Sequence, residues 1–143
     1  ASKAFPNGCC ISHDGTKLII VESVPGAIIE IPIIENDQAG GRKVLCELGS
    51  IVPDGVACSS DGGFVVACYR PDIILHWHAE SGLSTLALDP RGTVIAAPTN
   101  VAFTGPKLET LIVPNLGRWH LTRGNLGVKG IPLHYPTPEQ IGS

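Results

Sequence analysis

The feature that most constrains the fold of this chain is an internal repeat with a period of about one third of its length. Asn7, Asp54 and Asn100 fall in register when the copies are aligned, separated by 47 and then 46 positions. In the first two copies an Asp-Gly pair follows seven residues later, beginning at Asp14 and at Asp61. Self-similarity at such a fixed interval is typical of proteins built from repeated structural units. The sequence therefore predicts three copies of one unit.

Each copy divides into four short runs that read as β-strands. Gly and Pro, 17 and 12 residues respectively, lie at intervals between these β-branched runs, which indicates many strands joined by turns. Four strands with a period near 46 form one blade of a β-propeller. We therefore predict an all-β chain of three four-stranded blades at about 5–51, 52–96 and 97–136, with a tail at 137–143. The expected strands are about 9–12, 17–22, 27–33 and 42–48, then 56–59, 64–69, 73–79 and 83–88, then 101–104, 110–114, 118–123 and 127–134.

Three blades are too few to close a ring, because propellers use roughly four to eight. Each blade packs an apolar face on its neighbours, so an isolated set of three would expose two large hydrophobic faces. We therefore expect a complement, either a missing N-terminal half or a second copy of the chain. The absence of Met fits a fragment, and removal of an initiator before Ala1 explains it equally well.

Composition narrows the possible partners and the compartment. Hydrophobic residues are 43% and charged residues 16% of the chain, which excludes the signature of disorder. The net charge is −3 and no run of Lys or Arg occurs, so a nucleic-acid partner is not expected. No apolar stretch approaches the roughly 20 residues that span a bilayer, and the N-terminus lacks the apolar core of a signal peptide. Five cysteines without a C-x-x-C motif predict small buried thiols in a reducing, cytoplasmic setting, namely Cys9, Cys10, Cys46, Cys58 and Cys68.

The residues that are equivalent in the three copies are also candidates for chemistry. Asn7, Asp54 and Asn100 precede the innermost strand of their blades, so they are expected to converge at the mouth of the central channel. Converging oxygen-bearing side chains suit a hard divalent cation. Asn-Gly and Asp-Gly are also the strongest hairpin dipeptides, so Asn7-Gly8 and Asp54-Gly55 have a purely structural reading as turns. The residues alone leave these two readings open.

Other polar residues carry weaker signals. His76 and His78 share one face of a strand, a spacing that can bind zinc, but they lie in the third strand of a blade and are expected to serve packing or the surface. His13 is expected in a hairpin tip, and His120 in the third strand of its blade. No Gly-x-Ser-x-Gly elbow surrounds a serine, so a serine hydrolase has no support.

The ordered set of motifs resembles the SMP-30/gluconolactonase/LRE-like family, whose animal members are called regucalcin. Nearly the whole chain takes part in the resemblance. The matching stretches are Pro6-Asn-Gly followed by Ser12-x-Asp-Gly, Pro53-Asp-Gly-Val-Ala followed by Asp61-Gly and Val66-Ala-Cys-Tyr, Pro98-Thr-Asn-Val-Ala-Phe-x-Gly-Pro, and the tail Leu126-Gly-Val-Lys-Gly-Ile-Pro-Leu. The tail looks like the C-terminal end of the family. The resemblance therefore implies the second half of a six-bladed propeller.

What the resemblance implies for function is a lactone-opening hydrolase with one divalent cation in its channel. The family holds the cation with a Glu near the N-terminus, an Asn in Pro-Asn-Gly and an Asp in Pro-Asp-Gly, and the last two correspond to Asn7 and Asp54. The Glu and the substrate-binding Arg and Asn belong to the first half of the family, and no glutamate here matches that motif. The cation, Ca²⁺, Zn²⁺, Mg²⁺ or Mn²⁺, would polarise the lactone carbonyl and stabilise the oxyanion. Asp54 would act as the catalytic residue that orients or deprotonates water. The position of Asn100 in the repeat, and not the resemblance, leads us to expect that it contacts substrate or a metal-bound water.

Two other readings compete with the lactonase. One is a non-enzymatic propeller that binds calcium or a protein partner. The other is a different six-bladed enzyme, of a strictosidine-synthase-like or paraoxonase-like kind, since such proteins share parts of the repeat. Metal-dependent turnover of a sugar lactone separates the first reading from the second. The third depends on residues of the first half.

Overall fold

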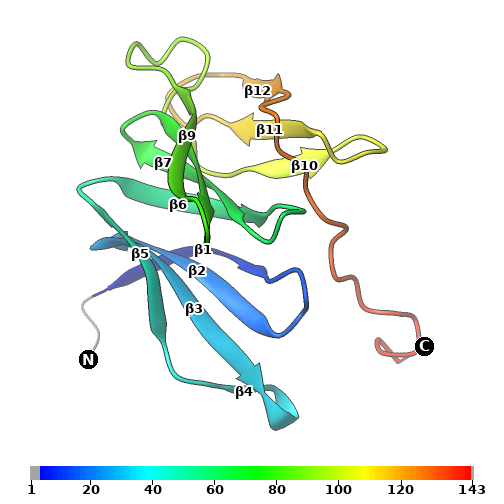
Figure 1. The fold of residues 1–143 in the computed structure, drawn as a ribbon. Helices are drawn as coiled ribbons and strands as arrows, with labels where there is room; N and C mark the ends of the chain where they lie inside the picture. Colours follow the sequence, from blue (N-terminus) through cyan, green and yellow to red (C-terminus); the bar gives the residue numbers. More distant parts are fainter. Residues whose placement is uncertain (1–3, 143) are drawn as a thin grey trace.

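The computed structural model describes residues 4–142 and consists of three antiparallel sheets stacked in chain order. Figure 1 shows the first sheet at the bottom, the second in the middle and the third at the top. The only helical element among the described residues is a short 3-10 turn, η1 (Glu35–Asp37). Within the same residues no helix is long and apolar enough to cross a membrane. The predicted all-β class is confirmed.

The first sheet is a meander with one strand more than expected. It contains β1 (Phe5–Ile11), β2 (Lys17–Val24), β3 (Gly26–Ile34) and β5 (Lys43–Gly49), with β4 (Gln38–Ala39) as a short addition. Both β4 and β5 pair with β3, at opposite ends of that strand. They therefore share the outer position of one blade.

The second sheet has the four strands that the repeat predicts. These are β6 (Val52–Cys58), β7 (Phe64–Arg70), β8 (Ile73–His78) and β9 (Gly82–Leu88), paired in chain order. The hairpin from β6 to β7 contains Asp61-Gly62, and Gly62 has a φ of +88°. The equivalent Asp14-Gly15 lies between β1 and β2, with a φ of +73° at Gly15. Both Asp-Gly pairs therefore serve as turns, as predicted.

The third sheet has three strands, and the prediction of a fourth at 127–134 is wrong. Its strands are β10 (Ala102–Thr104), β11 (Thr110–Pro114) and β12 (Leu121–Gly124), so the third strand also begins later than the expected residue 118.

The segment after β12 leaves the third sheet and crosses to the other two. Gly130 forms an isolated antiparallel bridge with Ser59, and Ser60 N–H donates to the Lys129 carbonyl at 2.8 Å. Gly130 also lies directly against the ring of Phe103, where a Cβ would be 2.3 Å from the ring. The Gly130 N–H donates to the Leu108 carbonyl at 2.8 Å, in the loop between β10 and β11. Because its backbone pairs with that loop and with the end of β6, the segment does not extend β12. Figure 1 shows it descending beside the three sheets.

The core lies in two layers between the sheets, and β7 contributes to both. One layer joins the first and second sheets and the other joins the second and third. Full burial of a Val or Ile side chain stabilises by about 1.5–3 kcal/mol, so these layers are the main source of stability. Alternation along β7 sends Phe64, Val66 and Cys68 to the first layer and Val65 and Ala67 to the second.

The outermost sheets leave large apolar side chains exposed. Phe5 and Val24 are each 60% exposed on the first sheet, and Trp119 and Leu121 are exposed on or beside the third. In the second sheet, β7 is covered on both faces, and the exposed Leu83 and Leu88 lie on the outer strand β9. This distribution is the one expected for a stack of blades that lacks neighbours at its two ends.

Candidate functional site

The inner strands of the first two sheets begin earlier than expected, so two of the three repeat-equivalent residues lie within them, and the third precedes the inner strand of the third sheet. Asn7 is in β1 and Asp54 in β6, each next to an irregularity in the pairing with the following strand. Asn100 lies two residues before β10. Asn7 and Asn100 are exposed and Asp54 is half-buried, so all three side chains are open to ligands.

Glycines bring these residues into a row. A Cβ on Gly8 would be only 2.4 Å from the Asp54 carbonyl oxygen, and a Cβ on Gly55 would be 2.5 Å from Asn100 Cα. Neither Gly8 nor Gly55 is among the residues with positive φ. Their conformations are therefore ordinary, and it is the close approach of adjacent inner strands that requires glycine here. The reading of Asn7-Gly8 and Asp54-Gly55 as hairpin turns is wrong.

Asn7 and Asp54 contact each other at the junction of the first two sheets. Burial raises the pKa of the Asp54 carboxyl, and the Asn7 side-chain amide, hydrogen-bonded to it, opposes that rise. The Asn7 Nδ2 also donates to Ser23 Oγ at 3.2 Å. Ser23 Oγ in turn donates to the Pro53 carbonyl at 2.6 Å. A buried serine at the end of β2 thus holds both halves of the pair in place.

Ser23 was not identified from the sequence, because no equivalent serine follows the other two copies of the motif.

Asn100 differs from Asn7 in its side-chain contacts. Its Oδ1 accepts a hydrogen bond from the Val101 N–H at 2.9 Å and lies against Gly55. Asn100 therefore extends the row on the far side of Asp54.

The donor set of this row fits a hard cation only in part. It offers one carboxylate and the amide oxygens of Asn7 and Asn100, and oxygen ligands of this type suit Ca²⁺, Mg²⁺ or Mn²⁺. Among residues 4–142 no group of three His, Cys, Asp or Glu side chains is arranged to hold a metal. Glu22 forms a two-point pair with Arg42, and Glu30 pairs with Lys17 at 3.0 Å, so neither supplies a further carboxylate. The row by itself therefore offers too few oxygen ligands to enclose such a cation.

The histidines lie away from the row. His76 Nε2 is 3.1 Å from Ser59 Oγ and 3.3 Å from an Asp61 carboxylate oxygen, and His78 Nε2 is 3.0 Å from the Asp61 carbonyl. Both histidines thus hold the β6–β7 hairpin, and they do not form a zinc site. His120 precedes β12 and does not lie within it as expected, and its Nε2 is 3.0 Å from the Val94 carbonyl.

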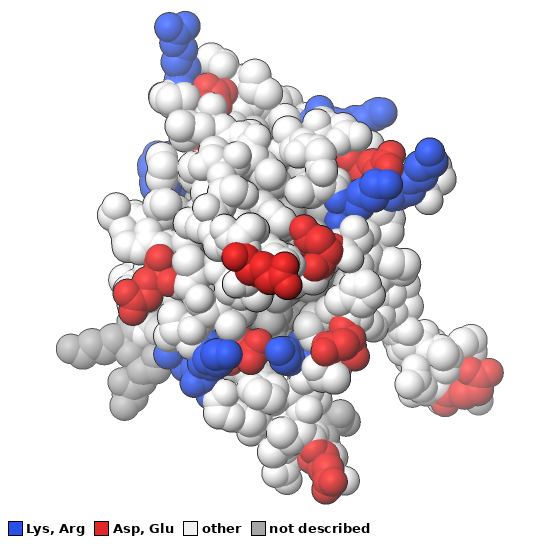
Figure 2. All heavy atoms as spheres, viewed as in Figure 1, with Lys and Arg blue, Asp and Glu red and all other residues white. Residues whose placement is uncertain are grey.

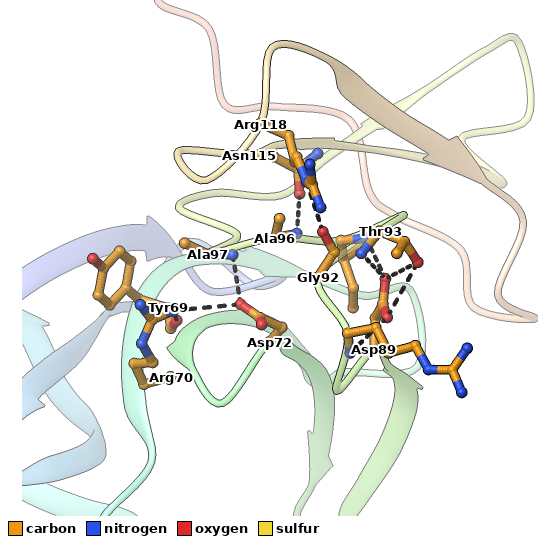
Figure 3. A network of polar contacts seen from close by, with 12 residues as sticks. Tyr69, Arg70, Asp72, Asp89, Gly92, Thr93, Ala96, Ala97, Asn115 and Arg118 are labelled. Atoms are coloured by element: carbon orange, nitrogen blue, oxygen red, sulfur yellow. Dashed lines mark hydrogen bonds and ion pairs between the residues drawn. The ribbon is translucent and has the colours of Figure 1, made fainter.

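A polar network fixes the loop that leads to Asn100 (Figure 3). Asp89 accepts hydrogen bonds from the Val94 N–H at 2.6 Å and the Thr93 N–H at 2.7 Å, and these bonds lower the pKa of its carboxyl. Asp72 accepts from the Ala97 N–H at 2.5 Å, and Asn115 Oδ1 accepts from Ala96 N–H at 2.8 Å.

The sequence predicted none of this network, in which Asn115 is the buried centre. It is buried, and its Nδ2 donates to the Val113 carbonyl, the His120 carbonyl and Thr122 Oγ1. Its position after β11 carries no repeated motif, so no signal in the sequence marks it.

The inner strands also border a hollow of about 850 Å³. Its walls come from β1, β6, β10 and the segment after β12, and Cys10, Cys58, Asn100 and Tyr135 are among its lining residues. On the face in Figure 2, acidic and basic side chains are interspersed, without one continuous basic surface.

Comparison with known proteins places the repeat in a family. The family model described as SMP-30/Gluconolactonase/LRE-like region matches residues 2–115. No curated protein sequence matches the chain. Solved structures share its fold, among them three with identities of 16–23% to this chain.

These structures are a luciferin-regenerating enzyme, a calcium-binding regucalcin from Agrobacterium tumefaciens and a gluconolactonase from Xanthomonas campestris. Their TM-scores are 0.69, 0.71 and 0.60, at identities of 23%, 22% and 16%. The matches cover 90%, 92% and 90% of this chain but only 48%, 50% and 37% of the other chains. The chain thus spans half or less of the length of these proteins, and its three sheets correspond to about half of a six-bladed propeller. It belongs to the SMP-30/gluconolactonase/LRE-like family.

Proposed function

We propose that this chain supplies half of the active site of a lactone-opening hydrolase of the gluconolactonase type. The observation that carries the proposal is the contact between Asn7 and Asp54, which occupy the same place in successive repeats and lie on adjacent inner strands. Membership of the family, which includes gluconolactonases, supports the reaction class. The substrate is a sugar lactone or a related cyclic ester.

The proposed roles follow from the donor atoms. Asn7 and Asp54 would hold one divalent cation, which when bound supplies Lewis-acid polarisation of the carbonyl under attack. Asp54 would accept the proton of the attacking water, a role that suits a carboxylate whose pKa is raised by burial. Asn100, on the far side of Asp54, would bind the substrate through hydrogen bonds to its hydroxyl groups.

A complement is part of this proposal, because two or three oxygen ligands do not complete a cation site. The proteins of known structure that share the fold are about twice as long. The exposed apolar side chains on the outer sheets are the surfaces such a complement would cover. It would be an N-terminal half or a second copy of the chain.

The test is hydrolysis of glucono-1,5-lactone by the completed ring, with the release of acid as the readout. Turnover is measured before chelation, after chelation, and after re-addition of Ca²⁺, Mg²⁺, Mn²⁺ or Zn²⁺. We expect turnover that requires a cation and falls at least 100-fold in Asp54→Asn. The matched control is Glu80→Gln, which removes one negative charge from an exposed turn and should leave turnover unchanged.

Two results would contradict the proposal. Equal turnover in Asp54→Asn and Glu80→Gln would show that the reaction does not need the Asp54 carboxylate. Calcium binding that depends on Asp54 without any lactone turnover would favour a non-enzymatic calcium-binding propeller, the property named for the Agrobacterium regucalcin.

A further inference from the structure

Two thiols from different sheets are in contact inside the hollow formed by the inner strands. Cys10 Sγ in β1 lies 3.4 Å from Cys58 Sγ in β6. Forty-eight positions separate these cysteines in the chain. They belong to the first and the second repeat, so the contact joins two blades.

Of the five cysteines, all of which lie in the described part of the chain, only these two have sulfurs in contact. Cys9 is exposed, and Cys68 is buried with its sulfur directed to the Val66 carbonyl. Cys46 lies in β5, and its sulfur is 3.6 Å from the Glu47 carbonyl. Proximity therefore selects one pair from ten possible pairs.

The two cysteines are held by the core and are also open to small molecules. Cys58 is 7% exposed and lies in the first core layer, with Cys10 packed against that layer. Both residues also line the hollow of about 850 Å³, so a small molecule can reach the sulfurs without unfolding of the sheets. The sulfurs, 3.4 Å apart, must approach by about 1.4 Å to reach the covalent S–S length of about 2.05 Å. Side-chain rotation together with a small shift of the strands supplies a change of that size.

We propose that Cys10 and Cys58 form a reversible disulfide that cross-links the first two blades when the protein meets a hydroperoxide. The structure holds the reduced state, in which both sulfurs carry thiols. The oxidised state joins β1 to β6 within four residues of Asn7 and of Asp54, at the wall of the candidate site.

The chemistry proceeds in two balanced steps. The Cys58 sulfur attacks the hydroperoxide, so that an S–O bond forms and the O–O bond breaks. The departing oxygen takes up the thiol proton, leaving as water when the oxidant is hydrogen peroxide. The Cys10 sulfur then attacks Cys58 sulfenic acid, the S–S bond forms, the S–O bond breaks, and the hydroxyl group leaves as water with the Cys10 proton. Two thiols lose two electrons and two protons, and hydrogen peroxide is reduced to two waters.

The order of the steps follows from the contact itself. Cys58 Sγ donates its proton toward the Ile11 carbonyl, so the S–H between the two sulfurs belongs to Cys10. That hydrogen bond lowers the pKa of Cys58 and raises the pKa of Cys10. Because the thiolate is the reactive form, Cys58 reacts first and Cys10 resolves the sulfenic acid.

The experiment treats the folded protein with hydrogen peroxide, blocks the remaining thiols, and maps linked peptides by tandem mass spectrometry. We expect a Cys10–Cys58 link that is removed by a dithiol reductant and accompanied by a loss of about 2 Da. Cys9→Ser is the matched control and should keep the link, whereas Cys10→Ser and Cys10→Ala should lose it. Closing a loop of this length should also raise the melting temperature of the Cys9→Ser protein by about 10 °C on oxidation, with no rise in either Cys10 variant.

Three outcomes would overturn the proposal. In the first, Cys58 pairs with a cysteine other than Cys10. In the second, Cys58 is oxidised beyond sulfenic acid while Cys10 stays free. In the third, the Cys10–Cys58 link appears only after denaturant is added, which would make it a product of the unfolded chain. Because Cys10→Ala tests the same point as Cys10→Ser with an apolar side chain, a folding defect in one variant leaves the other to decide.

Discussion

Replacing Gly8 by Ala should destabilise the protein through one contact between two blades. The new Cβ would lie 2.4 Å from the Asp54 carbonyl oxygen and 2.7 Å from Gly55 Cα. Ordinary contacts of a Cβ begin at 3.4 Å, so β1 must move by about 1.0 Å away from β6. Both atoms that the Cβ meets are backbone, so no side-chain rotation relieves the clash.

The magnitude combines two opposing effects. Overpacking at a well-packed position costs about 1–3 kcal/mol. Replacing glycine by alanine also restricts the unfolded chain, which stabilises the fold by about 0.4–1 kcal/mol. The clash involves backbone on both sides, so we take the upper part of the first range and expect a net loss of about 2 kcal/mol. For a chain of this length that corresponds to a fall in melting temperature of about 8 °C.

The assay is thermal and urea-induced unfolding followed by circular dichroism. Gly41→Ala is the matched control, because a Cβ there meets nothing within 4 Å and the residue has no positive φ. It should be neutral or slightly stabilising. The reasoning is refuted if Gly8→Ala is as stable as Gly41→Ala, because the predicted clash of the new Cβ with the β6 backbone would then cost no stability.

Three further predictions rest on other contacts. Arg42→Ala should destabilise by about 2 kcal/mol in urea unfolding, because it leaves the buried Glu22 carboxylate without its partner, and adding Glu22→Gln should recover most of the loss. Asn115→Ala should cost about 3 kcal/mol and increase amide hydrogen exchange in the 89–97 loop, whereas an alanine at exposed Asn125 should do neither. Hydrogen bonds from Ser12 and Thr16 lower the pKa of Asp14 from 3.8 to about 2, so its stabilisation is present above pH 3.8 and is lost as the pH falls toward 2. Asp14→Asn should therefore lose less stability than the unsubstituted protein as the pH falls from 3.8 to about 2. An equally steep fall in the melting temperature of both proteins would contradict this role of Asp14.

The repeat was sufficient to predict the architecture of most of the chain. Its period and its Asp-Gly turns indicated the stacked sheets, because turn geometry and alternation along a strand are local properties that each copy carries. The same register predicted that Asn7 and Asp54 lie together, since equivalent positions of neighbouring blades must meet at the inner strands. The dipeptides Asn7-Gly8 and Asp54-Gly55 also read as turns, and only the backbone conformation showed that their glycines serve the close approach of two strands.

The features that could be predicted from the sequence are therefore those that repeat: the all-β class, the sheet order and the row of polar residues at the inner strands. The features that occur once became visible only in the folded chain. The segment after β12 reads as a strand by composition, but its backbone hydrogen bonds join it to Ser60 of the neighbouring sheet and to Leu108 in the β10–β11 loop, not to β12. Ser23 and Cys58 likewise acquire their roles from partners on another blade. The physical reason is that local patterns fix the conformation of a segment, while the choice among possible partners depends on how the blades pack against one another.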